Sequence, residues 1–412
     1  MNTARGPLHL QPLLLAALLG TMAMMAYVAV VGPVVRRLGL PEWVAGLSIT
    51  AGGMFWMVLA RWWGRQSDRR GRKPVLLIGL AVFAATYLVL AAGVDGALHQ
   101  GLGLPATVVL LVVTRCLVGA FYAAVPPTAA ALIADHTTPA KRPAQMARLG
   151  TANAVGMVLG PAAAGALAAW DLSLALYAAA ALPAMALAVI AFGLPREMPA
   201  TADARSGDTG SSTSTSASPG PAHRPTVGHF DPRLRHASLT AFVAMASVAV
   251  AQVLVGFLAI DRLGLDASAG ARVAGFSLAT VGLALIVSQQ FVMRMKNVPL
   301  MRWVWLGASI AGMGFGCVAL ASTPTALLLC YGVAAFGMGF VFPSFQAMAA
   351  NAVERHEQGA AAGTVSAAQG LGMVLGPLAG TLLYRVAPGL PYALVGGALL
   401  LLGLFTLFRH RN

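Results

Sequence analysis

Charged side chains are scarce in this sequence. Asp, Glu, Lys and Arg together make up only 10% of its 412 residues, whereas hydrophobic residues make up 58%. An ordinary soluble domain is about one-quarter charged, because its surface must face water. The shortage of charge therefore excludes a soluble protein and indicates a chain that uses the lipid bilayer as its solvent.

Cysteine is also scarce, and the motifs of several enzyme classes are missing. Cys116, Cys317 and Cys330 all lie in apolar runs and are too few for a disulfide framework. The sequence has no phosphate-binding glycine loop, no metal-ligand spacing and no hydrolytic constellation. We therefore expect a protein that is not an enzyme and that needs no metal or other cofactor.

Basic residues outnumber acidic ones by 27 to 13, which gives a net charge of +14. Such a charge could indicate nucleic acid binding, but here it is spread over short segments between apolar runs. In a membrane protein that distribution reports orientation, because cytoplasmic loops collect Lys and Arg. We expect no nucleic acid partner and a lipid bilayer around the chain.

Long apolar runs make up most of the sequence. A helix needs about 20 apolar residues to cross the hydrocarbon core, and twelve runs of that kind lie between charged or Pro/Gly-rich breaks. The runs are roughly 11–35, 44–63, 74–94, 105–134, 146–170, 173–194, 237–260, 270–291, 299–321, 325–350, 359–386 and 390–408. The first run exceeds the apolar region of a signal peptide, so we expect it to stay in the protein.

The basic residues support both this count and an orientation. With both termini in the cytoplasm, 21 Lys and Arg residues fall in inner segments and 5 in outer ones. One span more or fewer would scramble this asymmetry. We expect a multi-pass membrane protein with both termini cytoplasmic.

The chain is duplicated. The hexapeptide Gly-Met-Val-Leu-Gly-Pro occurs at Gly156–Pro161 and again at Gly372–Pro377. Residues 196–236 are rich in Ser, Thr, Gly and Pro and cannot bury a core, which predicts a flexible cytoplasmic linker. We expect an N-terminal six-helix bundle over 1–195 and a C-terminal one over 237–412. Duplicated membrane halves are typical of secondary transporters, whose substrate site lies between the repeats.

The segment between the second and third runs carries a motif. It reads Gly64-Arg-Gln-Ser-Asp68-Arg-Arg-Gly71-Arg72-Lys73. Gly64 and Gly71 would let a short turn pass close beneath neighbouring helices, and Asp68 at a membrane edge needs a partner such as Arg72. A merely topogenic basic loop is the alternative, but it explains neither the glycines nor the acid.

This segment resembles the signature loop of the major facilitator superfamily, in which a Gly, an Asp, a second Gly and an Arg-Lys pair occur at this spacing. The resemblance implies an all-α polytopic membrane protein with 12 transmembrane helices in two pseudo-symmetric six-helix bundles. It also implies that Asp68 contacts the start of the eleventh helix and latches the halves in an outward-open state.

The repeated hexapeptide is a second motif. Small residues at i and i+4 let another helix approach closely, and the proline bends the segment. The motif resembles one that the superfamily associates with antiporters, which implies a bend that seals the cavity against leakage. Plain helix packing is the alternative. The residues concerned are Gly156, Gly160, Pro161, Gly165, Gly372, Gly376, Pro377 and Gly380.

Arg115 is an ordinarily charged side chain well inside a span. It lies about 15 Å deep, and an arginine at such depth marks a functional site by default. With Leu111 and Gly119 it resembles a superfamily motif implicated in proton transfer, although Val118 stands where glutamine is usual. A structural arginine bonded to carbonyls of a neighbouring helix is the alternative.

Proton coupling has few other candidates. No Asp, Glu or His lies deep in any predicted span, although many proton-coupled exporters use an embedded carboxylate. Asp135 ends the fourth span in a segment that resembles the acid-then-basic loop of drug exporters. We expect Asp68, Arg72 and Asp135 to form a charge network at a cytoplasmic gate, and coupling to use Asp68, Asp135, Asp261 or, indirectly, Arg115.

Polar and soft side chains within the spans predict a central cavity that takes an adaptable, amphipathic cargo. The candidate lining residues are Met25, Tyr27, Tyr122, Asn153, Gln252, Gln289, Gln346 and Gln369. Each could instead join helices. The resemblance is strongest to the bacterial 12-helix drug:proton antiporter branch, which implies a multi-pass protein of the bacterial cytoplasmic (inner) membrane.

We therefore expect a monomeric exporter of a small drug or siderophore-like metabolite that works by proton antiport and alternating access. An importer or facilitator of a polar nutrient is an alternative, although its site would need denser hydrogen bonding. A non-transporting sensor would more naturally carry a folded signalling domain.

Overall fold

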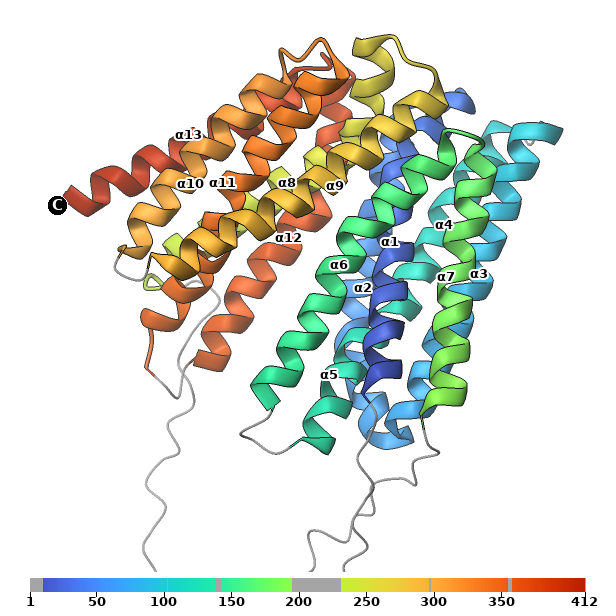
Figure 1. The fold of residues 1–412 in the computed structure, drawn as a ribbon, viewed down its shortest axis with the longest axis horizontal. Coiled ribbons are helices and arrows are strands. Elements are labelled where there is room, and N and C mark those ends of the chain that lie inside the picture. Colours follow the sequence, from blue (N-terminus) through green and yellow to red (C-terminus); the bar gives the residue numbers. More distant parts are fainter. Residues whose placement is uncertain are drawn as a thin grey trace, which may run out of the picture.

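The computed structural model of the chain is built of helices joined by short connections (Figure 1). It describes residues 10–101, 103–137, 142–194, 231–295, 298–354 and 358–411, and these residues contain no strand. The helices are α1 (Gln11–Arg37), α2 (Trp43–Arg70), α3 (Arg72–Gln100), α4 (Leu104–Tyr122), α5 (Val125–His136), α6 (Arg142–Ala168), α7 (Leu172–Gly193), α8 (Arg235–Leu263), α9 (Ala267–Arg294), α10 (Leu300–Val318), α11 (Pro324–Asn351), α12 (Gln358–Tyr384) and α13 (Leu390–Arg411).

Most of these helices are long and apolar enough to cross a bilayer. Within the described ranges eleven segments meet that condition, and α4 with α5 counts as one of them. α10 is outside this set although it is long enough, because Arg302, Trp303 and Trp305 near its start lower its mean hydropathy. It nevertheless packs against both α11 and α13. The predicted architecture of twelve membrane-crossing passes is confirmed.

The fourth pass is broken, which the sequence analysis did not predict. The run expected as one helix over 105–134 forms α4 and α5, with Ala123 and Ala124 between them. Pro126 and Pro127 open α5, and a proline both lacks an N–H donor and crowds the carbonyl four residues earlier. The break therefore falls where the backbone hydrogen-bond ladder cannot continue.

The described helices form two halves (Figure 1). α1 to α7 make the N half and α8 to α13 make the C half. α1 packs on α6 in the N half and α8 packs on α12 in the C half, so equivalent helices form equivalent pairs. α8 begins at Arg235, two residues before the expected start of the C half. The predicted flexible linker lies mostly outside the described residues.

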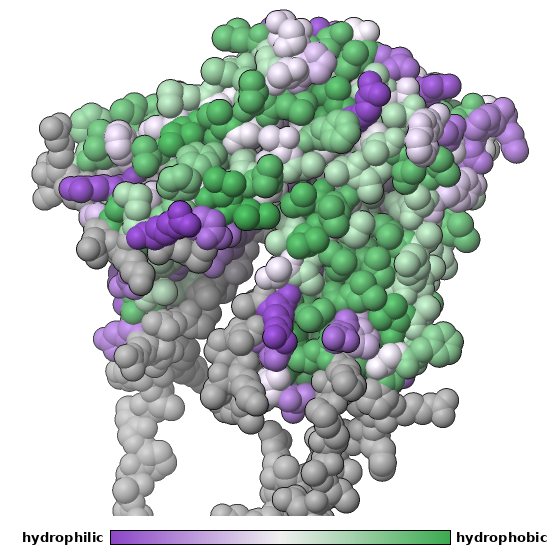
Figure 2. Space-filling model, in the orientation of Figure 1, coloured by the Kyte–Doolittle hydropathy of each residue, from purple (hydrophilic) through white to green (hydrophobic). Residues whose placement is uncertain are grey.

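The halves touch at one end and separate toward the other (Figure 1). We call the end at which α7 ends and α8 begins the linker side, and the opposite end the far side. Figure 2 shows a cleft between the halves on the linker side, and a largely hydrophobic outer surface on both lobes. Such a surface suits contact with lipid.

Candidate functional site

The signature segment is more helical than a loop. α2 continues through Arg70, and only Gly71 separates it from α3. Gly71 has φ +89°, a conformation that glycine adopts without strain, so its predicted role in a turn is confirmed. The close approach predicted at Gly64 is wrong: it lies within α2, and a Cβ added there would meet nothing within 4 Å.

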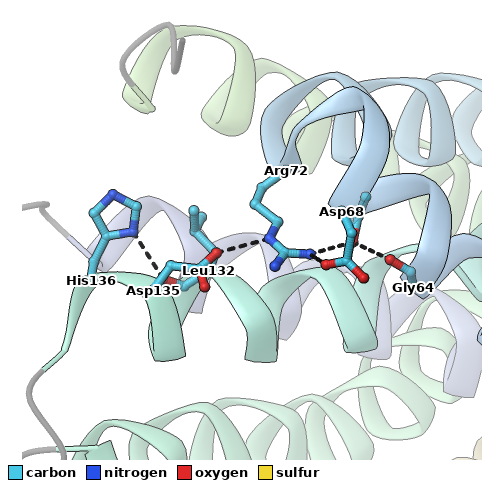
Figure 3. Close-up of polar contacts among 7 residues, drawn as sticks. Gly64, Asp68, Arg72, Leu132, Asp135 and His136 are labelled. Carbon is cyan, nitrogen blue, oxygen red and sulfur yellow. Dashed lines mark hydrogen bonds and ion pairs between the residues drawn. The ribbon is translucent and has the colours of Figure 1, made fainter. Parts of the chain in front are cut away.

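Arg72 links three helices at the linker side (Figure 3). One guanidinium nitrogen donates to Asp68 Oδ1 at 2.6 Å, and Nε donates to Asp135 Oδ2 at 2.9 Å. The Arg72 side chain is only 16% exposed, whereas the Asp68 and Asp135 side chains are 63% and 47% exposed. The predicted contact of these three side chains is confirmed. Because the carboxylates face water, the network adds little stability, and it fixes the mutual geometry of α2, α3 and α5 instead.

All three members of this network belong to the N half. The start of α12, which the resemblance makes a partner of Asp68, lies across the cleft (Figure 1). The ion pair recorded for Asp68 in the described part of the chain is with Arg72. A latch between Asp68 and α12 therefore requires the halves to close on the linker side.

Lys73 braces the same end of the N half. Its Nζ donates to the carbonyl oxygen of Ala191 at 2.9 Å and to that of Leu194. These carbonyls lie at the end of α7, where the last C=O groups of a helix lack partners within the helix and the helix dipole favours a cation. The two basic residues of the motif therefore have different roles. Arg72 binds the carboxylates of Asp68 and Asp135, and Lys73 caps the end of α7.

Arg115 is buried inside the N half, with 3% exposure. Its guanidinium carbon lies 4.3 Å from the centre of the Tyr27 ring, and its NH1 is 4.0 Å from Met24 Sδ. Its Nε is buried without a hydrogen-bond partner. The ion pairs recorded among the described residues do not include Arg115. A cation held by an aromatic face and a thioether alone is weakly compensated at this depth.

Two of the predicted cavity residues, Tyr27 and Tyr122, are buried inside the N half. Tyr27 is 1% exposed, and its hydroxyl lies 3.0 Å from Ser48 Oγ. Tyr122 is 8% exposed and lies 3.1 Å from Thr21 Oγ1, which donates to Asn153 Oδ1 at 3.0 Å. The chain from Tyr122 to Asn153 joins α4, α1 and α6. Lone hydroxyls such as those of Thr21 and Ser48 are common in apolar runs, so no sequence pattern marked these two residues.

The other predicted cavity residues are more accessible. Met25, Gln252 and Gln369 are half-buried, and Gln289 and Gln346 are exposed. Gln289 lies two helical turns after Gly282, at which a Cβ would contact Val158 of α6. Gln289 is therefore on the same face of α9 as Gly282, the face that points toward α6.

The repeated hexapeptides pack each half together. A Cβ added at Gly156 or Gly160 would lie 2.7 Å or 2.5 Å from a backbone carbonyl oxygen of α1. At Gly372 and Gly376 the corresponding distances to carbonyl oxygens of α8 are 2.6 Å and 2.9 Å. The predicted close helix approach is confirmed in both copies.

The two motif prolines also lie where the halves meet. A Cβ at Gly275 of α9 would be 2.5 Å from the Pro161 carbonyl oxygen, and one at Gly46 of α2 would be 2.6 Å from that of Pro377. Thr50 Oγ1 donates to the Val374 carbonyl at 2.7 Å, one turn further along α2. α6 and α12 are therefore packed both within their own half and against the other half.

Comparison with known proteins settles the family. The model of the Major Facilitator Superfamily matches residues 12–315 and 301–412. The chain belongs to the major facilitator superfamily. It is therefore a multi-pass membrane transporter, and the two halves are the two bundles of that fold.

The relatives of this chain include proteins named for drug resistance. The chain is 28% identical to the tetracycline resistance protein of class G from Vibrio anguillarum over 386 residues, which cover 90% of this chain and 89% of that protein. It is 30% identical to multidrug resistance protein 1 of Bacillus subtilis over 149 residues, 36% of this chain and 35% of that one.

Solved structures share the fold of this superfamily member. A bacterial homolog of the human lysosomal transporter Spinster, in an inward-facing and occupied conformation, matches with a TM-score of 0.74 and 13% identity. The match covers 99% of this chain and 98% of that one.

Proposed function

We propose that this transporter exports a small amphipathic molecule, a drug or a siderophore-like metabolite, by proton antiport. The observation that carries the proposal is the similarity to a tetracycline resistance protein over nine-tenths of the chain. The antiporter-like hexapeptides support it, because both copies pack closely within and between the halves. We propose that the monomer is the working unit, since each chain contains both halves.

The linker side is the cytoplasmic side in this proposal. The basic residues of the signature segment and of the helix ends around it gather there, as the positive-inside rule requires. The cleft then opens to the cytoplasm and the far side is closed. A cargo dissolved in the cytoplasm or inner leaflet would enter this cleft.

Proton movement would use groups at the edges of the cleft. Asp68 and Asp135 are exposed and share Arg72, so a change in the protonation of either would alter the hold of Arg72 on the other. Arg115 is a weakly compensated buried cation whose interactions would change when α1 and α4 move. In this proposal they form a proton-responsive network, since no Asp or Glu lies deep in the predicted spans.

Reconstitution into liposomes with an imposed pH gradient tests the proposal. We expect tetracycline, a fluorescent dye or a siderophore to accumulate against its concentration when the lumen is acidic, and collapse of the gradient by a protonophore to stop it. Downhill flux that ignores the gradient would instead establish a facilitator. Absence of flux for every cargo class in folded protein would favour a sensor.

A further inference from the structure

An ion pair joins the two halves at the far side. Arg36, at the end of α1, donates from NH2 to Asp261 Oδ2, at the end of α8, over 2.5 Å. The two side chains are 29% and 25% exposed, so the pair is partly shielded from water. Partial burial strengthens such a pair relative to one on an open surface.

Neighbouring groups hold this pair in place. Glu42, which precedes α2, accepts from the other terminal nitrogen of Arg36 at 2.7 Å. Tyr384, at the end of α12, donates to the same Asp261 oxygen at 2.9 Å. The Arg36 guanidinium lies 5.4 Å from the centre of the Phe257 ring. The far-side ends of α1, α2, α8 and α12 therefore converge on one cluster.

Arg36 and Asp261 occupy equivalent positions in the two halves. The sequence Arg36-Arg-Leu-Gly-Leu at the end of α1 corresponds to Asp261-Arg-Leu-Gly-Leu at the end of α8. The glycines of these segments, Gly39 and Gly264, have φ of +65° and +64°, so both helices end with the same turn. A two-fold relationship brings equivalent positions face to face, and this chain places opposite charges there.

α1 and α8 cross just inside this point. A Cβ added at Gly32 would lie 3.2 Å from the backbone of Phe257, and one at Gly256 would lie 2.7 Å from the Pro33 ring. The crossing leaves no room for cargo to pass. Arg36 and Asp261 thus lie on the far-side rim of a tightly packed barrier.

We propose that Arg36 and Asp261 form the far-side gate of the transport cycle. The pair holds the far side shut while the cleft is open on the linker side, and it breaks when the halves rock to open the far side. Tyr384 and Glu42 position the two charges. This inference rests on alternating access between the halves and needs neither the proposed cargo nor the proposed proton coupling.

Among the described residues, the recorded ion pairs join no other charges across the two halves. Arg262 follows Asp261 and is exposed, and the described residues record no ion pair for it. Arg37 and Arg272 lie near Asp266 at the start of α9. Arg262→Gln, which removes one positive charge from the same rim, is therefore a matched control for Arg36→Gln.

Double electron–electron resonance tests the gate without any transport assay. Spin labels would replace Gln100, at the far-side end of α3, and Val386, in the connection after α12, in full-length protein whose three cysteines are changed to serine. Val386 is 75% exposed, so a label there disturbs little packing. We expect Asp261→Asn and Arg36→Gln to raise the ratio of long to short distances about fivefold, the upper range for a partly exposed ion pair.

The controls and the charge swap decide the outcome. Arg262→Gln and Asp171→Asn should leave the distance distribution unchanged, and melting curves should show that every variant is folded. The triple variant Arg36→Asp with Glu42→Gln and Asp261→Arg should restore the short distance, because the glutamine removes the carboxylate that would otherwise repel the new one. Single variants that match the wild type, or single variants that open the far side with no recovery in the swap, would overturn the gate. The spin-label distances do not depend on cargo or on a pH gradient. A failed liposome assay would therefore contradict the proposed function without contradicting the far-side gate.

Discussion

Gly160 of α6 lies against Met22 of α1 with no room for a side chain. A Cβ at Gly160 would come within 2.5 Å of the Met22 carbonyl oxygen and 3.0 Å of its Cα. Backbone atoms cannot yield as the tip of a flexible side chain can. The antiporter-like hexapeptide therefore acts first as a packing surface, whatever it adds to transport.

Gly160→Ala should destabilise the N half by about 1–3 kcal/mol, the usual cost of overpacking a close contact. The measurement is the thermal midpoint of the purified protein in detergent. Gly150→Ala in the same helix is the control, because a Cβ there would meet nothing within 4 Å. Alanine favours a helix more than glycine does, so Gly150→Ala should melt at the wild-type temperature or above it. Equal midpoints for the two variants would contradict the packing account.

Asp135→Asn should weaken transport more than it weakens the fold. The change removes the charge that Arg72 Nε binds at 2.9 Å while keeping the shape of the side chain. We expect the rate of energised uptake to fall at least about tenfold, which corresponds to about 1.4 kcal/mol. The rate would be measured in liposomes with matched amounts of inserted protein.

Asp171→Asn is the control for that variant. Asp171 caps α7 on the far side by accepting from the Leu174 N–H at 2.9 Å, and asparagine caps a helix equally well. Its uptake rate should match the wild type. Asp68→Asn should resemble Asp135→Asn, since Arg72 binds both carboxylates. Normal uptake by Asp135→Asn would refute the linker-side gate.

Lys73→Met should loosen the end of α7. It removes the ammonium that caps the Ala191 and Leu194 carbonyls while keeping much of the aliphatic length. A hydrogen bond from a charged donor contributes roughly 1.5 kcal/mol, so the thermal midpoint should fall and backbone amides near residue 190 should exchange faster. Arg70→Met, in the last turn of α2, should leave both quantities unchanged. Unchanged amide exchange at α7 in Lys73→Met would contradict the cap.

The start of α9 should show a distinct pH dependence. Asp266 accepts from Ser268 Oγ at 2.7 Å and from the Ala269 N–H at 2.9 Å. The Ser268 hydroxyl and then the Ala269 N–H lower the pKa of Asp266, with smaller help from Arg37 and Arg272. A lowered pKa means that the folded state favours the charged form. The stabilisation is therefore complete above the unfolded pKa of about 4 and is lost as the pH falls through the folded pKa.

The melting difference between the wild type and Asp266→Ala tests this sign. The wild type should melt higher at pH 7, because the variant loses the helix cap. The gap should shrink as the pH falls below about 4, where the wild-type carboxylate takes up a proton. A gap that stays constant down to pH 3 would show that the charge of Asp266 does not matter.

The sequence was a good guide to the fold because the bilayer imposes simple rules. Length and hydropathy located the passes, and the duplicated hexapeptides located the two halves. The break between α4 and α5 was missed because the prolines follow residues as apolar as any in the run. Gly64 was misread because the motif suggested a turn, whereas α2 continues through it.

The candidate site was predictable where its members are close in sequence or, as for Asp135 at 63 residues from Arg72, where a family motif marks them. Asp68 and Arg72 are four residues apart and pair across one turn of chain. Arg36 and Asp261 are 225 residues apart and meet only because the two halves face each other. Asp261 was suspected only as an acid at a membrane edge, and nothing in the local sequence pointed to Arg36 as its partner.

Arg115 offers the sharpest separation of function from stability. It is 3% exposed and has a buried Nε without a hydrogen-bond partner, so its charge costs desolvation energy that Tyr27 and Met24 only partly offset. Arg115→Met should therefore melt at the wild-type temperature or above it, because a buried charge is replaced by an apolar chain of similar length. The same variant should lose accumulation against a gradient, if the arginine is retained for proton coupling rather than for packing. A large drop in the melting temperature would mark Arg115 as a structural residue. Full accumulation in a stable Arg115→Met protein would mean that proton coupling does not need Arg115 and uses Asp68 and Asp135 instead.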